Sequence, residues 1–579
     1  MSDIAARRQA LRDRFPVWRP RTLADWLDDC VRTYGSRPFV LCDHGALSYR
    51  QVAEESRRLA AGLRELGIGA GDRVGMLLAN SLEFVTVKFA IARLGAIAVP
   101  FNYLYRRDEL AFVLGDSGCR VLVTMTGFGS LDYQRMLDDI APGWDTAGFA
   151  ARHPAADELP SLRHVVLAEA EQPARQGLPL VANLGATAAR LDVPPECVDP
   201  LGPADLLYTS GTTGSPKGVL LTHDSVLRTA YASALTRAYA DGRRIVYALP
   251  CYHMFGYIEG LLSAMFVGGA AIMQQKFTAE GYFRAIDAHR ATDMLCVPTM
   301  AVAMVESPAR ARYDLSSLTA ILCGSAPAPV WLWQRIAKDF GVSEIVTGYG
   351  MTECGGCMSL TLPEDPLALA SSTVGRPKLA GAAGVAGVDA LVIYRVVDPD
   401  SGEELPPGTP GELLSTGPTA MIGYWNRPAE TADALRDGWL HSGDLGLVRA
   451  DGYLELTGRR KELYKSGGEL VMPKEIEDLL AGHGDISQVF AVGLSDDRWG
   501  EIGCVVVVRA PGATITEDDV LALCRDKLAR FKVPKRVVFY RSEDLPTTPT
   551  GKVQKFRLAE QLRSADAVTG AERLPAGTS

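Results

Sequence analysis

Residues 208–219, YTSGTTGSPKGV, combine hydroxyl side chains, glycines and one lysine between two apolar segments, LLYTS and VLLTH. Glycines let backbone N–H groups approach an anion closely, and hydroxyls add further hydrogen-bond donors. Lys217 adds a point charge that suits a phosphate group. The spacing is not that of a Walker P-loop, because Lys217 follows proline and precedes Gly218. The stretch therefore predicts a phosphate-binding loop of another kind, with a flexible linker as the alternative.

A second polar island, YGMTE at residues 349–353, ends a strand-like run. Tyr349 offers an aromatic face for a base, and Thr352 offers a hydroxyl for a phosphate oxygen. Glu353 offers a carboxylate, which Mg²⁺ prefers alongside substrate phosphates. The alternative is a helix capped by Thr352 with Glu353 in solvent, and taken alone this is the simpler interpretation.

Three more islands lie towards the C-terminus. HSGDLG at 441–446 is predicted to place Asp444 in a tight turn, where its carboxylate can accept from two ribose hydroxyls. An ordinary aspartate turn is the alternative. GRRKELYKSGGE at 458–469 and PTTPTGKVQKFR at 546–557 supply cations on glycine-rich loops. Each of these two loops can also be read as a solvated basic loop.

One CxxC pair occurs, Cys354-Gly-Gly-Cys357. A redox pair or half of a zinc site would use this spacing, but no second CxxC or nearby pair of histidines completes a metal site. Small residues lining a pocket are the favoured interpretation. The chain has 11 cysteines, an odd number that suits reduced thiols.

Length and charge narrow the class of protein. A chain of 579 residues is too long for one core, so two or more domains are expected. The net charge of −9 argues against a general nucleic-acid binder. The N-terminal stretch has no apolar signal region, and no apolar run reaches the ~20 residues of a membrane span. A cytoplasmic protein is therefore expected.

Hydrophobic periodicity predicts an α/β fold with parallel pairing. LADWLDDCVRTYG and YRQVAEESRRLAAGLRELG read as helices, and RVGMLLAN and RVLVTM as buried strands. The alternation continues through VYALP, MLCVP, AILCGS and EIVTGYG. Between about residues 386 and 457, short strands and turn signals predict a small, largely antiparallel β unit.

The last part of the chain reads as a separate α+β domain. KEIEDLLAGHG, VFAVGL, CVVVVRA, TEDDVLALCRDKLA and RVVFY give helix, strand, strand, helix and strand. We therefore predict a large N-terminal domain at 1–460, a small domain at 461–562 and a disordered tail at 563–579.

Five islands, YTSGTTGSPKGV, YGMTE, HSGDLG, GRRKE and PTTPTGK, occur in an order and approximate spacing that resemble the adenylate-forming (ANL) superfamily. This superfamily holds acyl-CoA synthetases, aryl-CoA ligases, luciferases and peptide-synthetase adenylation domains. The resemblance covers roughly residues 23–560, and the acyl-CoA synthetase or fatty-acid–CoA ligase branch fits best. It implies an AMP-binding domain followed by a mobile C-terminal domain.

The resemblance implies a two-step reaction that uses ATP, Mg²⁺ and coenzyme A. A carboxylate attacks the α-phosphate of ATP and expels pyrophosphate, and a thiol then displaces AMP from the acyl-adenylate. Positioning and cations dominate catalysis of such in-line displacements. The implied nucleotide-binding residues are Thr209, Ser210, Gly211, Thr212, Thr213, Gly214, Lys217, Gly324, Ser325, Tyr349, Asp444 and Arg459.

The same resemblance implies roles for the remaining polar residues. Thr352 contacts the α-phosphate, Glu353 holds Mg²⁺, and Lys552 reaches the attacking carboxylate. His253 matches the gate beside the carboxylate, with a core histidine as the alternative. In the C-terminal domain, Lys461 matches the hinge, Gly467 and Gly468 match the loop that reaches the thiol tunnel, and Lys465 matches a second lysine of that loop that acts in thioester formation.

The stretches YHMFGYIEGLLSAMF and CGSAP are apolar and small. They favour a hydrophobic acid as the substrate: fatty, alicyclic, terpenoid or aryl. The sequence departs from the family pattern in the Gly/Ala-rich segment at 378–396, which is longer than in the family by about eight residues. A surface loop tolerates such an insertion. It could instead alter the acyl pocket or the domain rotation. An adenylating enzyme that passes its product to a carrier protein or a separate transferase therefore stays open. So does a non-catalytic nucleotide- or acyl-binding protein, and the choice between monomer and homodimer.

Overall fold

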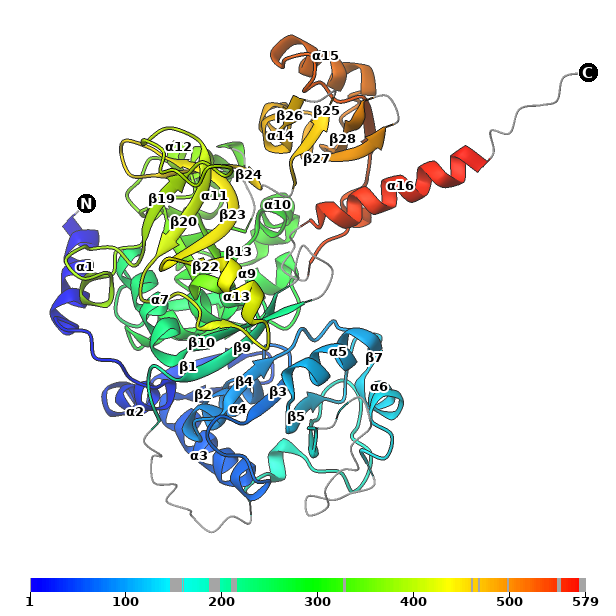
Figure 1. Ribbon diagram of the computed structural model, residues 1–579. Coiled ribbons are helices and arrows are strands. Elements are labelled where there is room, and N and C mark those ends of the chain that lie inside the picture. Colours follow the sequence, from blue (N-terminus) through cyan, green and yellow to red (C-terminus); the bar gives the residue numbers. More distant parts are fainter. Residues whose placement is uncertain are drawn as a thin grey trace, which may run out of the picture. The chain divides into compact units, whose positions relative to one another are not determined.

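The computed structural model describes residues 2–145, 159, 161–186, 198–209, 216–325, 328, 330–459, 462–466, 469–496, 499–548 and 553–571. The chain forms two compact units (Figure 1). The first contains Met1–Gly324, Val330–Ile393 and Ser415–Leu440, and the second contains Ser325–Pro329, Tyr394–Leu414 and His441–Ser579. The predicted domain boundary at residues 460 and 461 stays a prediction.

The first unit contains two seven-stranded sheets. The first sheet has the order β15-β14-β13-β11-β12-β1-β2, and all its strand pairs are parallel except β1–β2. Its strands are β1 Pro38–Cys42, β2 Gly45–Ser48, β11 Arg244–Tyr247, β12 Ala270–Met273, β13 Asp293–Cys296, β14 Ala320–Cys323 and β15 Glu344–Val346. The predicted strands at VYALP, MLCVP, AILCGS and EIVTGYG are confirmed.

The second sheet has the order β21-β10-β9-β4-β3-β5-β8. Strands β9, β4, β3, β5 and β8 are parallel, whereas β10 is antiparallel to both β9 and β21. Its strands are β3 Arg73–Leu77, β4 Ile97–Pro100, β5 Val121–Met125, β8 His164–Ala168, β9 Pro203–Thr209, β10 Lys217–Thr222 and β21 Gly423–Tyr424. The antiparallel β9–β10 pair brackets the predicted phosphate loop.

Helices surround these sheets, and α2, α3 and α4 pack together (Figure 1). Two of them begin at capping boxes, Thr22 with Asp25 and Ser48 with Gln51, which satisfy backbone N–H groups of the first turn. The helices of the first unit after α1 are α2 Leu23–Tyr34, α3 Tyr49–Glu65, α4 Leu82–Arg93, α5 Arg107–Ser117, α6 Tyr133–Ile140, α7 His223–Thr236, α8 Ser263–Met265, α9 Ala279–His289, α10 Pro298–Glu306, α11 Val330–Phe340, α12 Leu367–Ser372 and α13 Pro428–Ala434.

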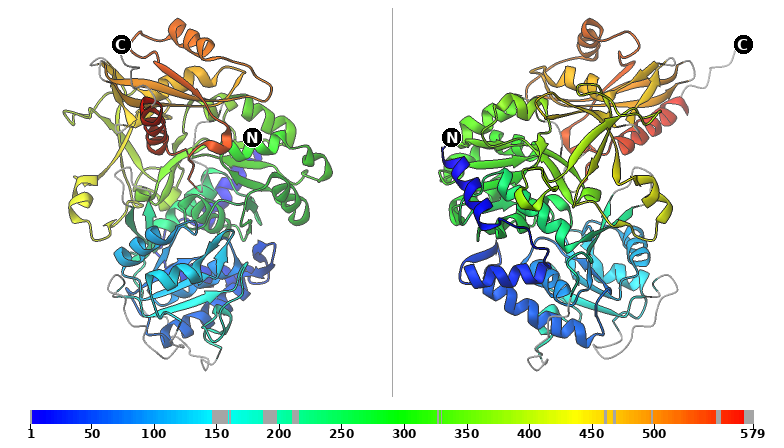
Figure 2. Two further views of the ribbon diagram at one scale, coloured as in Figure 1. Left: turned by 90° about the vertical axis from the view of Figure 1, so that its right-hand side faces the viewer. Right: turned by 60° about the vertical axis from the view of Figure 1, so that its left-hand side comes forward.

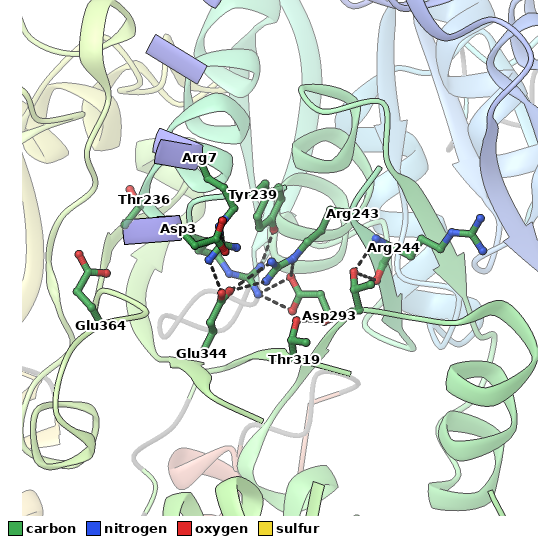
Figure 3. A network of polar contacts seen from close by, with 12 residues as sticks. Asp3, Arg7, Thr236, Tyr239, Arg243, Arg244, Asp293, Thr319, Glu344 and Glu364 are labelled. Carbon is green, nitrogen blue, oxygen red and sulfur yellow. Dashed lines mark hydrogen bonds and ion pairs between the residues drawn. The ribbon is translucent and has the colours of Figure 1, made fainter. Parts of the chain in front are cut away.

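The N-terminal helix α1, Ser2–Arg14, lies against elements that come much later in the sequence (Figure 2). Arg7 of α1 and Arg243 both point toward Glu344 at the start of β15 (Figure 3). Arg243 also pairs with buried Asp293 at 3.0 Å. These ion pairs between buried and half-buried groups hold the start of β15 and therefore the chain that leads into residues 348–353.

Residues 378–393 of the Gly/Ala-rich segment at 378–396 lie in the first unit. The segment forms a 3₁₀ turn at Gly381–Ala383, and Ala383 is fully buried. Asp389 accepts from the backbone N–H of Gly381 at 2.7 Å and pairs with Arg12 of α1 at 2.6 Å. The first strand of the small β unit, β19, therefore begins only at Ile393, a few residues later than the predicted start near 386.

The small β unit is a five-stranded sheet in the order β19-β20-β23-β22, with β24 paired to β23. The pairs β22–β23 and β23–β24 are antiparallel, as predicted. The strands are β19 Ile393–Val397, β20 Gly411–Thr416, β22 Leu435–Arg436, β23 Trp439–Val448 and β24 Leu454–Arg459. Shorter sheets elsewhere in the chain are formed by β6 Gly127–Phe128 with β7 Leu131–Asp132, and by β16 Gly348–Met351, β17 Gly356–Leu360 and β18 Arg376–Pro377.

A further sheet, which lies wholly in the second unit, has the order β26-β25-β28-β27, with β29 parallel to β28. Alternate residues of β28 enter two separate cores: Val505 and Val507 pack in one, and Cys504 and Val506 in the other. Burial on both faces explains the continuous apolar run CVVVV. The elements are β25 Tyr464–Ser466, β26 Glu469–Val471, α14 Pro473–Ala481, β27 Ile486–Asp496, β28 Gly500–Arg509, α15 Glu517–Lys527, β29 Arg536–Phe539 and α16 Lys555–Ala571.

Helix α16 corrects the predicted tail. Residues 563–571 are helical, because Leu558 and Leu562 of α16 are buried in the second of these cores and the helix continues beyond them. Residues 572–579 lie outside the described part of the chain. None of the described helices is long and apolar enough to cross a membrane.

Candidate active site

The ends of the predicted phosphate loop lie opposite one another. Thr209, the last residue of β9, is the register partner of Lys217, the first residue of β10. The Thr209 hydroxyl donates to the Lys217 carbonyl oxygen at 3.4 Å. Ser210, Gly211, Thr212, Thr213 and Gly214 lie outside the described residues. The hairpin therefore places both described ends of the loop at one edge of the sheet, and phosphate binding by it stays a prediction.

Tyr424, which sequence reasoning missed, connects two of the predicted site residues. The Lys217 ammonium lies over the Tyr424 ring, 5.0 Å from its centroid. The Tyr424 hydroxyl donates to Glu353 Oε1 at 2.9 Å. Burial and the neighbouring Glu353 carboxylate raise the pKa of Tyr424, so its hydroxyl stays protonated. Nothing in the sequence marks this tyrosine, because its neighbours come from strand pairing across about 200 residues of chain.

The island YGMTE forms the end of strand β16 and a short turn. Tyr349 lies in β16 and is almost wholly buried, whereas Thr352 and Glu353 lie in a 3₁₀ turn, Thr352–Cys354, that Gly355 ends with φ of 73°. The residue at the cap position of this turn is Met351, which makes no side-chain cap. The alternative in which Thr352 caps a helix is therefore wrong.

Glu353 has the chemistry of a metal ligand. Its carboxylate is half-buried and has no cationic ion-pair partner in the described part of the chain. The Glu353 carbonyl accepts from the backbone N–H of Met421 at 2.8 Å, which fixes its backbone. An oxygen ligand without a protein cation fits a hard ion such as Mg²⁺.

The CxxC pair, Cys354 and Cys357, has no metal-ligating partners in the described part of the chain. Among the described residues, no group of three or more His, Cys, Asp or Glu side chains could hold a metal ion. Cys354 Sγ lies 3.2 Å from Ser415 Oγ, and Cys357 donates to the Ser359 carbonyl at 3.2 Å. Burial raises the pKa of both thiols to about 12, so neither is a reactive thiolate at neutral pH.

His253 lies in the turn before a π-helix, η2 (Phe255–Leu262). Its Nδ1 accepts from the Phe255 N–H at 3.2 Å, so the neutral ring carries its proton on Nε2. The side chain is half-buried, which excludes the fully buried core histidine that the sequence left open.

Glycines bring this turn close to YGMTE. A methyl group added at Gly324 would lie 3.6 Å from the Gly348 carbonyl oxygen and 3.8 Å from Phe255. One added at Gly356 would lie 3.4 Å from Met254. Gly324 and Gly356 therefore face the start of η2, and Gly348 lies next to Gly324. Ser325, the next residue after Gly324, has φ of 72°, a left-handed backbone that costs energy in a non-glycine residue and is common at functional sites.

Asp444 and Arg459 lie in the second unit. They are register partners on the antiparallel strands β23 and β24, and Arg459 Nε lies 2.7 Å from Asp444 Oδ1. Asp444 is 3% exposed. The prediction that Asp444 lies in a tight turn is wrong, because the left-handed residue of HSGDLG is Gly443, with φ of 67°, and the chain is already extended at Asp444.

The other predicted residues of the second unit divide into two groups. Lys465 lies in β25 with an exposed side chain, and its backbone N–H donates to Glu501 Oε2 at 2.7 Å. Lys461, Gly467, Gly468 and Lys552 lie outside the described residues.

Lys555, three residues after Lys552, anchors that part of the second unit. Its ammonium pairs with Glu462 at 3.0 Å and Glu477 at 2.8 Å. Burial alone would lower the pKa of Lys555, but these two carboxylates raise it, so the side chain stays charged.

Comparison with known proteins decides the family. The family model for AMP-binding enzymes matches residues 27–425, and that for the AMP-binding enzyme C-terminal domain matches residues 475–552. The chain belongs to the AMP-binding enzyme family. The predicted superfamily and the α/β fold class are confirmed, and the prediction of an enzyme is confirmed at the level of this family.

Relatives within the family match almost end to end. A feruloyl-CoA synthase from Amycolatopsis sp is 36% identical over 519 residues, covering 88% of this chain and 94% of that protein. A mitochondrial medium-chain acyl-CoA ligase from Homo sapiens is 31% identical over 535 residues, covering 90% and 84%. The crystal structure of an anthranilate CoA ligase in complex with anthranoyl-AMP is similar with a TM-score of 0.81 and 25% identity, covering 94% of this chain and 98% of that one.

Proposed function

We propose that this AMP-binding enzyme activates a hydrophobic carboxylic acid with ATP to an acyl-adenylate and then transfers the acyl group to coenzyme A. The observation that carries the proposal is that Lys217 and Glu353 both contact the same side chain, Tyr424, in a chain that spans 94% of a feruloyl-CoA synthase. A cation for phosphate and a carboxylate for a metal are the two charged groups that the adenylation step needs.

In the first unit, the loop from Thr209 to Lys217 binds the β- and γ-phosphates, and Thr352 contacts the α-phosphate. Glu353 holds Mg²⁺, which neutralises charge on the phosphate oxygens when it is bound. Tyr349 and the backbone of Gly324 and Ser325 line the adenine site. The half-buried carboxylate of Glu353 supports its role as the metal ligand.

In the second unit, Asp444 accepts from the ribose hydroxyls while Arg459 holds its carboxylate in place. Lys552 stabilises the developing charge between the attacking carboxylate and the α-phosphate. Lys461 serves as a hinge between the two half-reactions, and Gly467 and Gly468 then approach the thiol. Lys465, which is exposed, acts in the thioester step.

The acid is hydrophobic. Met254 and Phe255, at the start of η2, face Gly356 of β17 and Gly324, the residue after β14, which leaves the wall beside His253 apolar and small. The relatives' names cover aryl and medium-chain acids, and both classes match this wall.

The cytoplasmic location, transfer to a carrier protein or transferase, and homodimer formation stay predictions.

The test is pyrophosphate release across aryl, medium-chain and bulky alicyclic acids, with and without coenzyme A. We expect acid-dependent release and, with coenzyme A, conversion of the adenylate to a thioester. Adenylate that accumulates whether or not coenzyme A is present would mean an adenylating enzyme that needs a separate acceptor. No acid-dependent release with any acid would contradict the proposal.

A further inference from the structure

One tyrosine contacts both charged groups of the nucleotide site in the first unit. The hydroxyl of Tyr424 donates to Glu353 Oε1 at 2.9 Å, and its ring lies beneath the Lys217 ammonium at 5.0 Å from the centroid. These contacts use different parts of the same side chain, the polar edge and the π-face. A substitution can therefore remove one contact and keep the other.

The backbone around Tyr424 is held by strand β10, and the next residue, Trp425, bonds to helix α5. Tyr424 pairs with Val219 of β10, and the N–H groups of the flanking residues Ile422 and Trp425 donate to Leu220 and Gly218. The Trp425 indole donates to the carbonyl of Asp116 at 3.1 Å. These bonds leave the Tyr424 backbone little freedom, which is the condition for a side chain to position its neighbours.

Asp116 reinforces this arrangement from helix α5. Its carboxylate accepts from Arg427 at 2.8 Å and from the Tyr208 hydroxyl at 2.7 Å. It thus ties the chain after Tyr424 to strand β9, the strand that leads into the phosphate loop. The phosphate loop and Tyr424 are therefore both connected to strand β9.

Lys217 and Glu353 carry opposite charges, yet neither has an ion-pair partner among the residues that the structure describes. Direct pairing of these two groups would consume the charges that a nucleotide and its metal ion require. Tyr424 gives each group a weaker, neutral partner instead: a π-face for the ammonium and a hydroxyl for one carboxylate oxygen.

We propose that Tyr424 is a positioning residue that holds Lys217 for phosphate and Glu353 for the metal ion and keeps the two from pairing with each other. The inference rests on the proposed function and names the residue that positions the charged groups of that site. Groups that orient metal ligands typically change metal affinity or activity by 10–100-fold when they are removed.

Two variants separate the two contacts. Tyr424→Phe keeps the ring beneath Lys217 and removes only the hydroxyl that Glu353 accepts from. Tyr424→Leu removes both contacts. Tyr313→Phe is the matched control, because the Tyr313 hydroxyl also donates to a carboxylate, Glu280 Oε1 at 2.8 Å, but in an exposed contact between α9 and the 3₁₀ turn Pro308–Arg312.

Two measurements are made on the full chain. The first is the Mg²⁺ concentration for half-maximal pyrophosphate release, together with KM for ATP and for the acid. The second needs no turnover: calorimetric titration of ATP with Mg²⁺ or Mn²⁺ present, and of ATP without any divalent ion.

For Tyr424→Phe we expect the half-maximal Mg²⁺ concentration to rise about tenfold, with the acid KM unchanged and metal-free ATP binding unchanged. For Tyr424→Leu we expect metal-free ATP binding to weaken as well, by about threefold to tenfold, because the cation–π contact is lost. Tyr313→Phe should match the wild type in every measurement.

A Tyr424→Phe enzyme with wild-type Mg²⁺ dependence and wild-type metal–ATP binding would overturn the inference. So would equal loss of metal-free ATP binding in both variants, which would indicate a general loss of structure. The calorimetric titrations still decide the inference if the wild type shows no acid-dependent pyrophosphate release, and in that case it is the proposed function that fails.

Discussion

Arg459 Nε lies 2.7 Å from Asp444 Oδ1, and the two residues face each other across the antiparallel strands β23 and β24. Asp444 is buried, whereas Arg459 is about one-third exposed, at 37%. The guanidinium therefore offsets the cost of burying the carboxylate. This geometry suits recognition of a neutral diol better than recognition of a phosphate.

The Asp444 carboxylate is expected to set a preference for ribose. The wild type should use ATP about 10–100-fold better than 2′-deoxy-ATP in kcat/KM, since a hydrogen bond to a charged group contributes about 1.5–3 kcal/mol. Asp444→Ala should lower the efficiency with ATP and abolish the preference. Steady-state kinetics with both nucleotides checks this, and an Asp444→Ala enzyme that still prefers ATP would assign ribose recognition elsewhere.

Lys552→Ala is expected to lose the adenylation step and keep the thioester step. One cation about 4 Å from the reacting oxygens contributes roughly 4 kcal/mol at an effective dielectric of 20, so adenylation should fall about 10³-fold. Transfer from a synthetic acyl-adenylate to coenzyme A should change by less than about threefold, a ratio that corresponds to under 1 kcal/mol. Lys535→Ala, which removes an exposed lysine of the same unit, is the control. Equal losses in both steps would refute a role specific to adenylation.

A buried ion pair behind the π-helix is expected to matter for stability. Lys378 pairs with Glu259 of η2 at 2.6 Å, and both side chains are at most 1% exposed. Lys378→Met leaves an uncompensated buried carboxylate and should cost about 3–5 kcal/mol. The double variant Lys378→Met/Glu259→Leu should recover most of this loss in urea unfolding. A double variant no more stable than the single one would show that packing, not charge, explains the effect.

His223 is expected to make the protein less stable in mild acid. Burial, and next the charge of Lys88, lower the pKa of His223 from 6.5 to about 3. The folded state therefore favours the neutral ring, and its Nδ1 accepts from the Leu23 N–H. As the pH falls, the unfolded chain binds the proton before the folded one. The contribution of His223 to the free energy of unfolding is therefore fully present above pH 6.5 and falls between pH 6.5 and 3, by about 1.4 kcal/mol per pH unit.

Urea unfolding at pH 7, 6 and 5 checks the pH dependence against His223→Asn, whose amide oxygen can accept the same bond. The wild type should lose stability more steeply with falling pH than this variant. Parallel pH profiles would mean that other groups cause the acid sensitivity.

Two neighbouring glycines, Gly324 and Gly348, should respond differently to alanine. A methyl group at Gly348 would lie 2.3 Å from the Ser359 carbonyl oxygen, whereas one at Gly324 would lie 3.6 Å from its nearest atom. Gly348→Ala should therefore destabilise the protein by about 1–3 kcal/mol, and Gly324→Ala by clearly less. Thermal unfolding of both variants checks this order, and an equal effect would contradict the close packing of β16 on β17.

The sequence by itself determined much of the fold and the chemistry. Hydrophobic periodicity located the strands and helices on either side of the site, because burial dictates apolar spacing locally. The polar islands at Thr209–Lys217 and Tyr349–Glu353 could be recognised because their composition suits neither a core nor a helix. Their membership in one family then followed from their order along the chain.

Only the tertiary structure decided which side chains meet. Tyr424 reaches Lys217 and Glu353 because β21 pairs with β10, and no local signal encodes that pairing. Asp444 lies in a strand opposite Arg459, although HSGDLG resembles a turn, because Gly443 alone takes the left-handed conformation. Long-range pairing depends on the summed burial and hydrogen bonding of whole strands, so a window of sequence predicts the residues of a site but not their partners.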